Sequence, residues 1–175
     1  MLLHVCCAPC SLGTVAYWRQ QGVEPILYYN NPNIHPYSEY RHRLAVLEEM
    51  AATEGLRLIT SNTYSLPSFF QAVMTVGAEF PARCRFCYRL RLEAAADMAT
   101  ELGVGSFTTT LLISPYQQHQ ELIAIGKEVA QQKGLFFAYA DLRPLFRQSQ
   151  QEARHRGYYR QKYCGCLFSN YESYK

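Results

Sequence analysis

The stretch His4-Val5-Cys6-Cys7-Ala8-Pro9-Cys10 decides how this chain folds. It follows the apolar residues Leu2 and Leu3, which are typical of a buried strand, and a helical pattern begins directly after it. Ser11 is a suitable N-cap for that helix and Gly22 a suitable end. The stretch therefore predicts a strand, a thiol-rich turn and a helix, with the thiols beside a helix N-terminus that favours the thiolate.

Length and composition indicate one ordered globular domain. The chain has 175 residues, of which 49% are hydrophobic and 18% charged, so it is long enough for a core and too apolar to be disordered. The net charge of +3 is too small to indicate nucleic-acid binding by itself. We expect no signal peptide and no membrane partner, because no basic flank or long apolar run is present. In the cytoplasm, the expected compartment, seven cysteines indicate metal ligands or redox groups rather than disulfides.

Strand-like and helix-like segments alternate along the chain. Strands are expected at 23–29, 56–60, 106–112 and 135–139, and helices at 37–54, 65–76, 84–102 and 114–132. Because no hairpin signals separate them, they predict an α/β fold in which helices flank a parallel sheet.

Sites in such sheets form beyond the carboxyl ends of the strands. The residues expected at that edge are Cys6, Cys7, Cys10, the loop 30–35, Ser114 and Asp141. The whole chain, 1–175, is expected to be one domain in which the segment 142–175 closes over the site.

The cysteines fall into three clusters, Cys6-Cys7-x-x-Cys10, Cys84-x-x-Cys87 and Cys164-x-Cys166. Two residues between thiols let both reach one metal or cluster, so all seven are candidate metal ligands. A zinc-stabilised RNA-binding protein is one alternative, although four thiols would complete a zinc site and seven are present. A thiol-disulfide oxidoreductase acting through Cys7 and Cys10 is another, but it leaves five cysteines without a role.

Cations and tyrosines surround the second and third cysteine clusters. Cations suit phosphates and aromatic faces suit unstacked bases, which predicts contacts with single-stranded RNA. A solvated basic face with cation–π packing explains the same residues equally well. The candidate RNA contacts are Arg85, Arg89, Tyr159, Arg160 and Lys162.

Three further residues are candidates for the site. His35 lies in a loop of turn formers and is a candidate ligand or base, with a turn hydrogen bond as the alternative. Tyr116 is a candidate substrate contact. Asp141 is an isolated acid just past the strand at 135–139, with an ordinary surface aspartate as the alternative.

The chain resembles the cobalamin-independent epoxyqueuosine reductases over nearly all of its length, and the resemblance rests on six motifs. In chain order they are His4-x-Cys6-Cys7-Ala8-Pro9-Cys10, Tyr29-Asn30-Asn31-Pro32-Asn33-Ile34-His35-Pro36, Arg83-Cys84-x-x-Cys87-Tyr88-x-x-Arg91-Leu92, Phe107-Thr108-Thr109-Thr110-Leu111-Leu112-Ile113-Ser114-Pro115-Tyr116-Gln117, Asp141-x-Arg143-Pro144 and Tyr159-Arg160-Gln161-x-Tyr163-Cys164-Gly165-Cys166.

The resemblance implies the last step of queuosine synthesis, the reduction of epoxyqueuosine at the wobble position of tRNA. It also implies a [4Fe–4S] cluster, an additional iron, and a carboxylate ligand for which Asp141 is the candidate. His35 and Tyr116 are candidate proton donors for that reaction. The implied partners are tRNA carrying wobble epoxyqueuosine and an external one-electron donor of the ferredoxin or flavodoxin kind.

The resemblance further implies an adenine-nucleotide α-hydrolase-like, Rossmann-like layer fold. The cysteine turn stands where ATP-using relatives of that fold carry a glycine-rich phosphate loop, which argues against ATP use. Fold alone does not assign a nucleotide-binding function.

Overall fold

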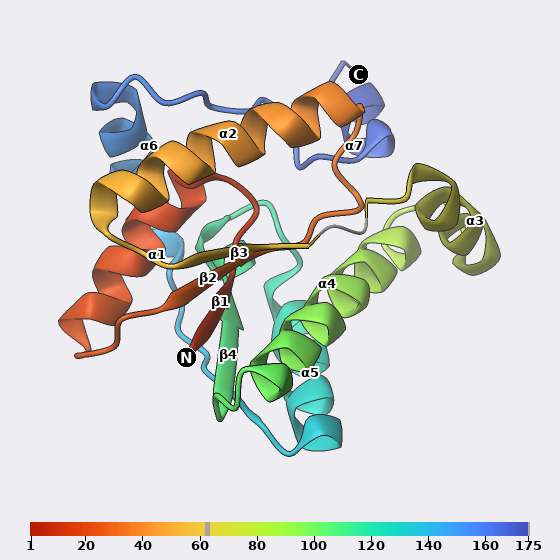
Figure 1. Cartoon of the computed structure of the whole chain (residues 1–175). Coiled ribbons are helices and arrows are strands. Elements are labelled where there is room, and N and C mark those ends of the chain that lie inside the picture. Colours follow the sequence, from red (N-terminus) through yellow and green to blue (C-terminus); the bar gives the residue numbers. More distant parts are fainter. Residues whose placement is uncertain (62–63, 175) are drawn as a thin grey trace.

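A computed structural model describes residues 1–61 and 64–174, and its five strands form one sheet with the order β3-β2-β1-β4-β5 (Figure 1). The strands are β1 (Leu2–His4), β2 (Ile26–Tyr29), β3 (Leu58–Thr60), β4 (Ser106–Thr109) and β5 (Phe136–Phe137). All neighbouring pairs run parallel, and Leu2 of β1 lies opposite both Ile26 and Phe107. The predicted parallel sheet is confirmed.

Helices cover both faces of this sheet (Figure 1). Successive strand residues point to opposite faces. Leu2 therefore packs into the core shared with α4 and α5, whereas Leu3 packs into the core shared with α1 and α2. The helices are α1 (Ala8–Gln20), α2 (Tyr37–Glu54), α3 (Leu66–Val76), α4 (Ala82–Glu101), α5 (His119–Lys133), α6 (Phe146–His155) and α7 (Leu167–Glu172), with short 3-10 helices η1 (Thr110–Ile113) and η2 (Arg143–Leu145). No helix within the described residues is long and apolar enough to cross a bilayer.

Two predicted helix ends are confirmed by their local chemistry. Helix α2 stops at Gly55, whose φ of 67° suits glycine, which has no Cβ to clash in the left-handed region. Helix α3 starts after Ser65, whose Oγ accepts a hydrogen bond from the Ser68 amide at 3.4 Å.

The predicted Ser11 cap is wrong. Helix α1 already begins at Ala8, with Cys7 in the N-cap position, because Pro9 suits the first turn, where its missing N–H would have no intrahelical partner. Ser11 lies one turn inside the helix, where its hydroxyl donates to the Cys7 carbonyl at 2.8 Å. The thiol turn is consequently shorter than expected, and Cys10 is part of the helix.

The predicted Ser114 cap is also wrong, and the strand expected at 106–112 ends at Thr109. The Thr109 hydroxyl accepts a hydrogen bond from the Leu111 amide at 3.2 Å, which turns the chain into η1. Helix α5 then starts only at His119.

The C-terminal part contains α6 and α7, which the sequence patterns did not predict. Helix α6 packs against α1, where the Gly13 amide donates to Ser149 Oγ at 2.9 Å. A Cβ on Gly13 would lie 2.9 Å from Ser149 Cβ, so glycine permits this close approach. The segment 157–166, called the tail below, then runs beside α2 towards α7 (Figure 1).

Candidate metal centre

The first thiol group consists of Cys6, Cys7 and Cys10, directly beyond the carboxyl end of β1. Their sulfur atoms lie within 4.8 Å of one another and all three residues are buried. In the described ranges this is the one group of three or more His, Cys, Asp or Glu ligand atoms so close together. All seven cysteines are free thiols. The first group therefore has the donor atoms and the spacing to hold a soft metal ion.

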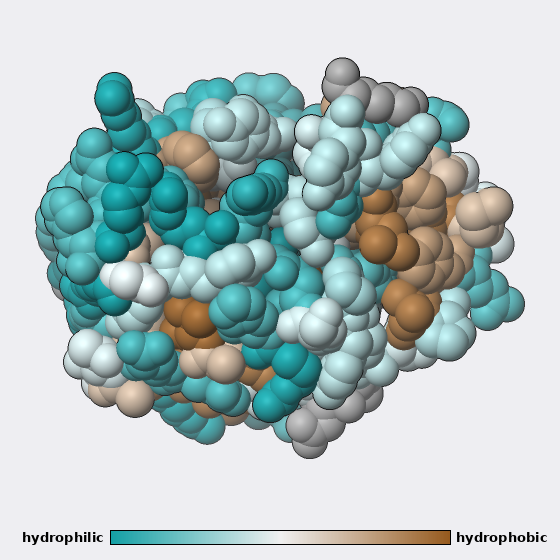
Figure 2. Space-filling view, turned by 90° about the horizontal axis from the view of Figure 1, so that it is seen from above, coloured by the Kyte–Doolittle hydropathy of each residue, from teal (hydrophilic) through white to brown (hydrophobic). Residues whose placement is uncertain are grey.

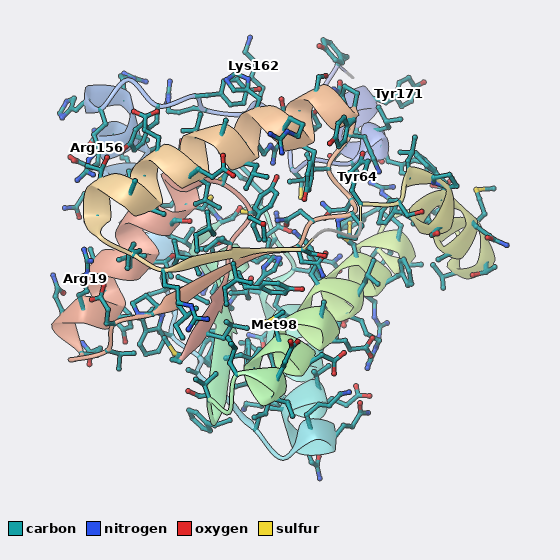
Figure 3. The ribbon with its side chains drawn as sticks, viewed as in Figure 1. Arg19, Tyr64, Met98, Arg156, Lys162 and Tyr171 are labelled. Atoms are coloured by element: carbon teal, nitrogen blue, oxygen red, sulfur yellow. The ribbon has the colours of Figure 1, made fainter. Side chains whose placement is uncertain are left out.

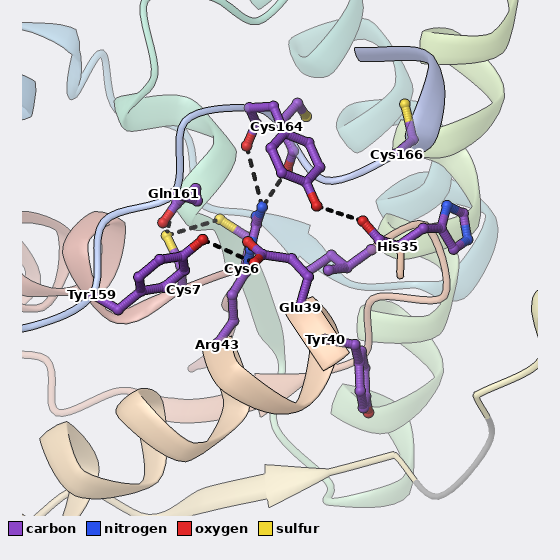
Figure 4. A network of polar contacts seen from close by, with 12 residues as sticks. Cys6, Cys7, His35, Glu39, Tyr40, Arg43, Tyr159, Gln161, Cys164 and Cys166 are labelled. Carbon is purple, nitrogen blue, oxygen red and sulfur yellow. Dashed lines mark hydrogen bonds and ion pairs between the residues drawn. The ribbon is translucent and has the colours of Figure 1, made fainter. Parts of the chain in front are cut away.

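Hydrogen bonds from other parts of the chain reach these sulfurs. Thr110 donates its hydroxyl to Cys6 Sγ at 3.4 Å. Gln161 of the tail donates its amide to Cys7 Sγ at 2.9 Å (Figure 4). Hydrogen bonds from Cys10 and Cys7 hold the pKa of Cys6 well below its usual range. Burial raises the pKa of Cys7. Without metal, Cys6 is the thiol of this group that most readily carries a negative charge.

The second thiol group consists of Cys84, Cys87, Cys164 and Cys166, which line a cavity of about 40 Å³. The first two come from the start of α4 and the last two from the tail. Among these four described residues, no three sulfurs lie within 4.8 Å of one another. Burial raises the pKa of Cys84 to about 11 and that of Cys87 to about 12. Both thiols of the helix are thus neutral near pH 7 until a cation displaces their protons.

Buried Arg43 holds the tail in place. Its guanidinium pairs with Glu39 at 2.7 Å and donates to the carbonyl oxygens of Cys164 at 3.0 Å and Tyr163 at 3.2 Å (Figure 4). The His35 amide donates to the Gly165 carbonyl at 2.8 Å. These bonds fix the third cysteine cluster relative to α2 and to the loop after β2.

Gly165 is required where the tail passes closest to the loop after β2. Its φ is 146°, and a Cβ there would lie 3.0 Å from Ile34 and 3.3 Å from the Asn33 side chain. The glycine between Cys164 and Cys166 is therefore part of the close fit of the tail.

The three candidate catalytic residues lie in different surroundings. His35 is buried, its Nε2 lies 3.1 Å from the Pro32 carbonyl, and burial lowers its pKa to about 4. Tyr116 is 81% exposed and packs edge-on against Phe146. Asp141 is exposed. Neither Tyr116 nor His35 is hydrogen-bonded to a cysteine sulfur among the described residues.

Asp141 pairs with Arg143 at 2.6 Å, and this guanidinium holds the pKa of the carboxyl down to about 2. Its oxygen lies 3.9 Å from His119 Nε2. In the described part of the chain it belongs to no group of three ligand atoms. Both carboxylate oxygens are bonded to the Arg143 guanidinium.

The five candidate RNA contacts fall on two surfaces. Arg85 pairs with Glu121 at 3.1 Å and Arg89 with Glu128 at 2.6 Å, between α4 and α5. The tail carries the other three, Tyr159, Arg160 and Lys162. Arg160 and Lys162 are exposed and have no ion pair with any described residue, and Lys162 projects above α2 (Figure 3).

Tyr159 is not free to stack on a base as it stands. Its ring stacks on His42 at 4.0 Å, and its hydroxyl donates to Glu39 at 2.9 Å.

Seen from above, hydrophilic side chains gather over α2 and α6, whereas hydrophobic ones gather over α3 (Figure 2). The unpaired cations of the tail thus belong to the hydrophilic part of this face.

Sequence reasoning missed the residues that support the thiols. Thr110 and Gln161 donate to sulfur, and Arg43 binds the tail carbonyls. Thr110 and Gln161 lie inside motifs of the chain, which was the available signal. No sequence signal pointed to Arg43, because its contacts lie 120 and 121 residues away along the chain.

Known proteins resemble this chain over nearly its whole length. The family model for epoxyqueuosine reductase QueH matches residues 1–172. A protein of that name from Dehalococcoides mccartyi is 38% identical over 174 residues, which cover 99% of this chain and 94% of the other. Its namesake from Helicobacter pylori is 36% identical, over 97% of this chain and 49% of that longer protein.

A solved structure shares the fold. It is the predicted subunit of tRNA methyltransferase from Methanocaldococcus jannaschii, with a TM-score of 0.51, 16% identity and 93% of each chain covered. This likeness shows the layer fold alone, whereas the family match covers the cysteine motifs as well. The chain belongs to the epoxyqueuosine reductase QueH family.

Proposed function

We propose that this chain reduces epoxyqueuosine at the wobble position of tRNA to queuosine, in the cytoplasm, at an iron–sulfur centre. The observation that carries this proposal is the family match over residues 1–172 in a chain whose seven thiols gather in two groups bridged by the tail. The relatives are named for this reaction.

The reaction removes the epoxide oxygen as water and leaves an alkene, which takes two electrons and two protons. In this proposal a redox metal centre supplies these electrons, whereas a pair of thiols would supply them in the oxidoreductase alternative. A bound [4Fe–4S] cluster, with an additional iron, would pass electrons one at a time from an external one-electron donor and offer a Lewis acid to the epoxide oxygen.

The residues present fit such a centre. Thiolates are the usual ligands of iron–sulfur clusters, and seven thiols exceed the four that one cluster takes. The three that remain are enough to hold an additional iron with an open position. Arg91, which lines the cavity of the second thiol group, has a buried Nη2 that lacks a partner among the described residues, as expected beside an anionic group.

The chain's own residues would position the site in stated ways. Gln161 and Thr110 orient sulfur through hydrogen bonds, and Arg43 keeps the tail over the thiol turn so that water is excluded. In this proposal the segment 142–175 is the closing segment of a single domain.

Proton delivery and the carboxylate ligand remain proposals from the sequence. His35 is neutral near pH 7 because its pKa is about 4, so it would act as a relay or a positioning group rather than as a cation. Tyr116 is exposed enough to meet the substrate. Asp141 would bind iron once it is released from Arg143.

For tRNA, the tail residues Arg160 and Lys162 are the better phosphate contacts because no described acid neutralises them. Arg85 and Arg89 would first have to leave their glutamates. Tyr159 would have to leave His42 before it stacks on a base.

The proposal is tested by metal and sulfide analysis of protein purified without oxygen, followed by incubation with epoxyqueuosine-containing tRNA and a reductant. We expect iron, acid-labile sulfide and conversion of the nucleoside. Zinc alone would favour the zinc-stabilised RNA-binding alternative, and a metal-free protein that exchanges disulfides would favour the oxidoreductase alternative.

A further inference from the structure

Arg91 carries a buried charge without a carboxylate partner. Three arginines are at most 6% exposed, namely Arg43, Arg83 and Arg91. Arg43 pairs with Glu39 at 2.7 Å and Arg83 with Glu172 at 2.5 Å. Arg91 has no carboxylate within 4.0 Å in the described residues, although the residue is only 1% exposed.

Its hydrogen bonds do not neutralise this charge. Nε donates to the Cys87 carbonyl at 3.3 Å, and Nη2 is buried without a partner in the described part of the chain. A buried, uncompensated ion destabilises a protein by several kcal/mol. A negative charge is therefore expected at this place in the working protein.

Several thiol groups lie around the guanidinium of Arg91. Arg91 lines the cavity formed by the second thiol group and interacts electrostatically with Cys87, Cys164 and Cys6. Cys6 belongs to the first thiol group, so the guanidinium lies within electrostatic reach of both. Metal-bound thiolates would place several negative charges beside the guanidinium.

We propose that Arg91 is the counter-charge of the metal centre, a positioning residue that holds the anionic metal–thiolate group in place and favours its reduction. This inference rests on the proposed iron–sulfur function. A cluster with four thiolate ligands is an anion, and each electron added makes it more negative. A fixed positive charge nearby stabilises the loaded form over the metal-free form and the reduced form over the oxidised form.

The sign of the effect on stability therefore depends on the metal. In the metal-free protein Arg91 lacks most of this compensating charge, so Arg91→Met leaves the thermal midpoint unchanged or raises it. In the loaded protein the same change removes a favourable interaction, so loading raises the midpoint by less than in the wild type. A purely structural role of Arg91 would lower both midpoints together.

The experiment compares wild type, Arg91→Met, Arg91→Lys and, as a matched control on the same helix, Arg89→Met. Arg89 is only partly buried and pairs with Glu128, so its loss should leave iron retention and the reduction potential unchanged. Each protein is reconstituted with iron and sulfide, and three quantities are measured: iron retained in the presence of a chelator, the reduction potential, and the thermal midpoint with and without metal.

We expect Arg91→Met to lose iron at least tenfold faster and to have a tenfold smaller equilibrium constant for reduction, which is 59 mV for a one-electron couple. Arg91→Lys, which keeps the charge, should restore most of both. If Arg91→Met does not fold, Arg91→Gln carries the same expectation. Wild-type iron retention, potential and gain on loading in the Met or Gln variant would overturn the inference. A wild type that binds no iron would instead overturn the proposed function.

Discussion

The side-chain amide of Gln161 donates a hydrogen bond to Cys7 Sγ at 2.9 Å and so joins the C-terminal tail to the thiol turn behind β1. These residues lie 154 positions apart in the chain. If Cys7 binds metal, this amide is a group that tunes the centre without ligating it.

Replacing Gln161 by Leu removes that donor. A hydrogen bond to a ligating sulfur stabilises the more negative, reduced cluster, so the variant should have a lower reduction potential while retaining its iron. Redox titration of the loaded protein measures this. Gln151→Leu, at an exposed position of α6, is the matched control, and equal potentials in both variants would contradict a role of the Gln161 amide.

Arg43→Met should release the tail. It removes the donors to the Tyr163 and Cys164 carbonyls and leaves Glu39 without its cation, which should cost about 3 kcal/mol of unfolding free energy. Urea unfolding measures the loss, and limited proteolysis should cut within 157–166 sooner than in the wild type. Arg41→Met, at an exposed position of the same helix, should do neither. An uncleaved tail in Arg43→Met would show that other contacts hold it.

Much of the fold was predictable because local chemistry decides it. The periodicity from Tyr37 to Glu54 and the glycine at Gly55 give α2 its observed ends. Ser114 was wrongly predicted as an N-cap. A serine before a proline caps a helix only where the backbone enters the helix at that residue. Thr109 and η1 turn the chain earlier, so α5 begins later, at His119.

The thiols of the site could be predicted from the sequence, but the residues that hold them in place could not. The cysteine spacings around Cys6, Cys84 and Cys164 are typical of metal ligands. The partners of Arg43 are backbone carbonyls 120 and 121 residues away, and no spacing in a sequence indicates such a contact. The ion pair between Asp141 and Arg143 could not be predicted for another reason. A carboxylate near a strand end is equally consistent with a metal ligand and with an ion pair.

The tail cations should dominate tRNA binding. Changing Arg160 and Lys162 together to Gln should flatten the plot of log affinity against log salt by about 1.5, since each lost phosphate contact removes about 0.7 to 0.9 of slope. The matched control changes Arg85 and Arg89 together to Gln, which removes the same charge from residues already paired with glutamates. A larger loss of slope in the control would place the RNA on α4 and α5 instead.

Asp141→Asn separates the two interpretations of that carboxylate. As an iron ligand, Asp141 is needed for the chemistry, so the variant should keep its fold and tRNA affinity while epoxide reduction falls at least a hundredfold. As the surface partner of Arg143 it matters little, because an exposed ion pair contributes at most about 1 kcal/mol. Single-turnover rates with loaded protein decide, and a near-normal rate would remove Asp141 from the site.

We propose that this chain, loaded with an iron–sulfur centre, removes the epoxide oxygen of epoxyqueuosine in tRNA. Mass spectrometry of the nucleosides from such tRNA, after incubation with iron-loaded protein and a one-electron reductant under anaerobic conditions, measures this reaction. We expect epoxyqueuosine to be replaced by queuosine, which is lighter by one oxygen atom, only when protein, metal and reductant are all present. Unchanged epoxyqueuosine in the presence of fully loaded, reduced protein that binds the tRNA would contradict it.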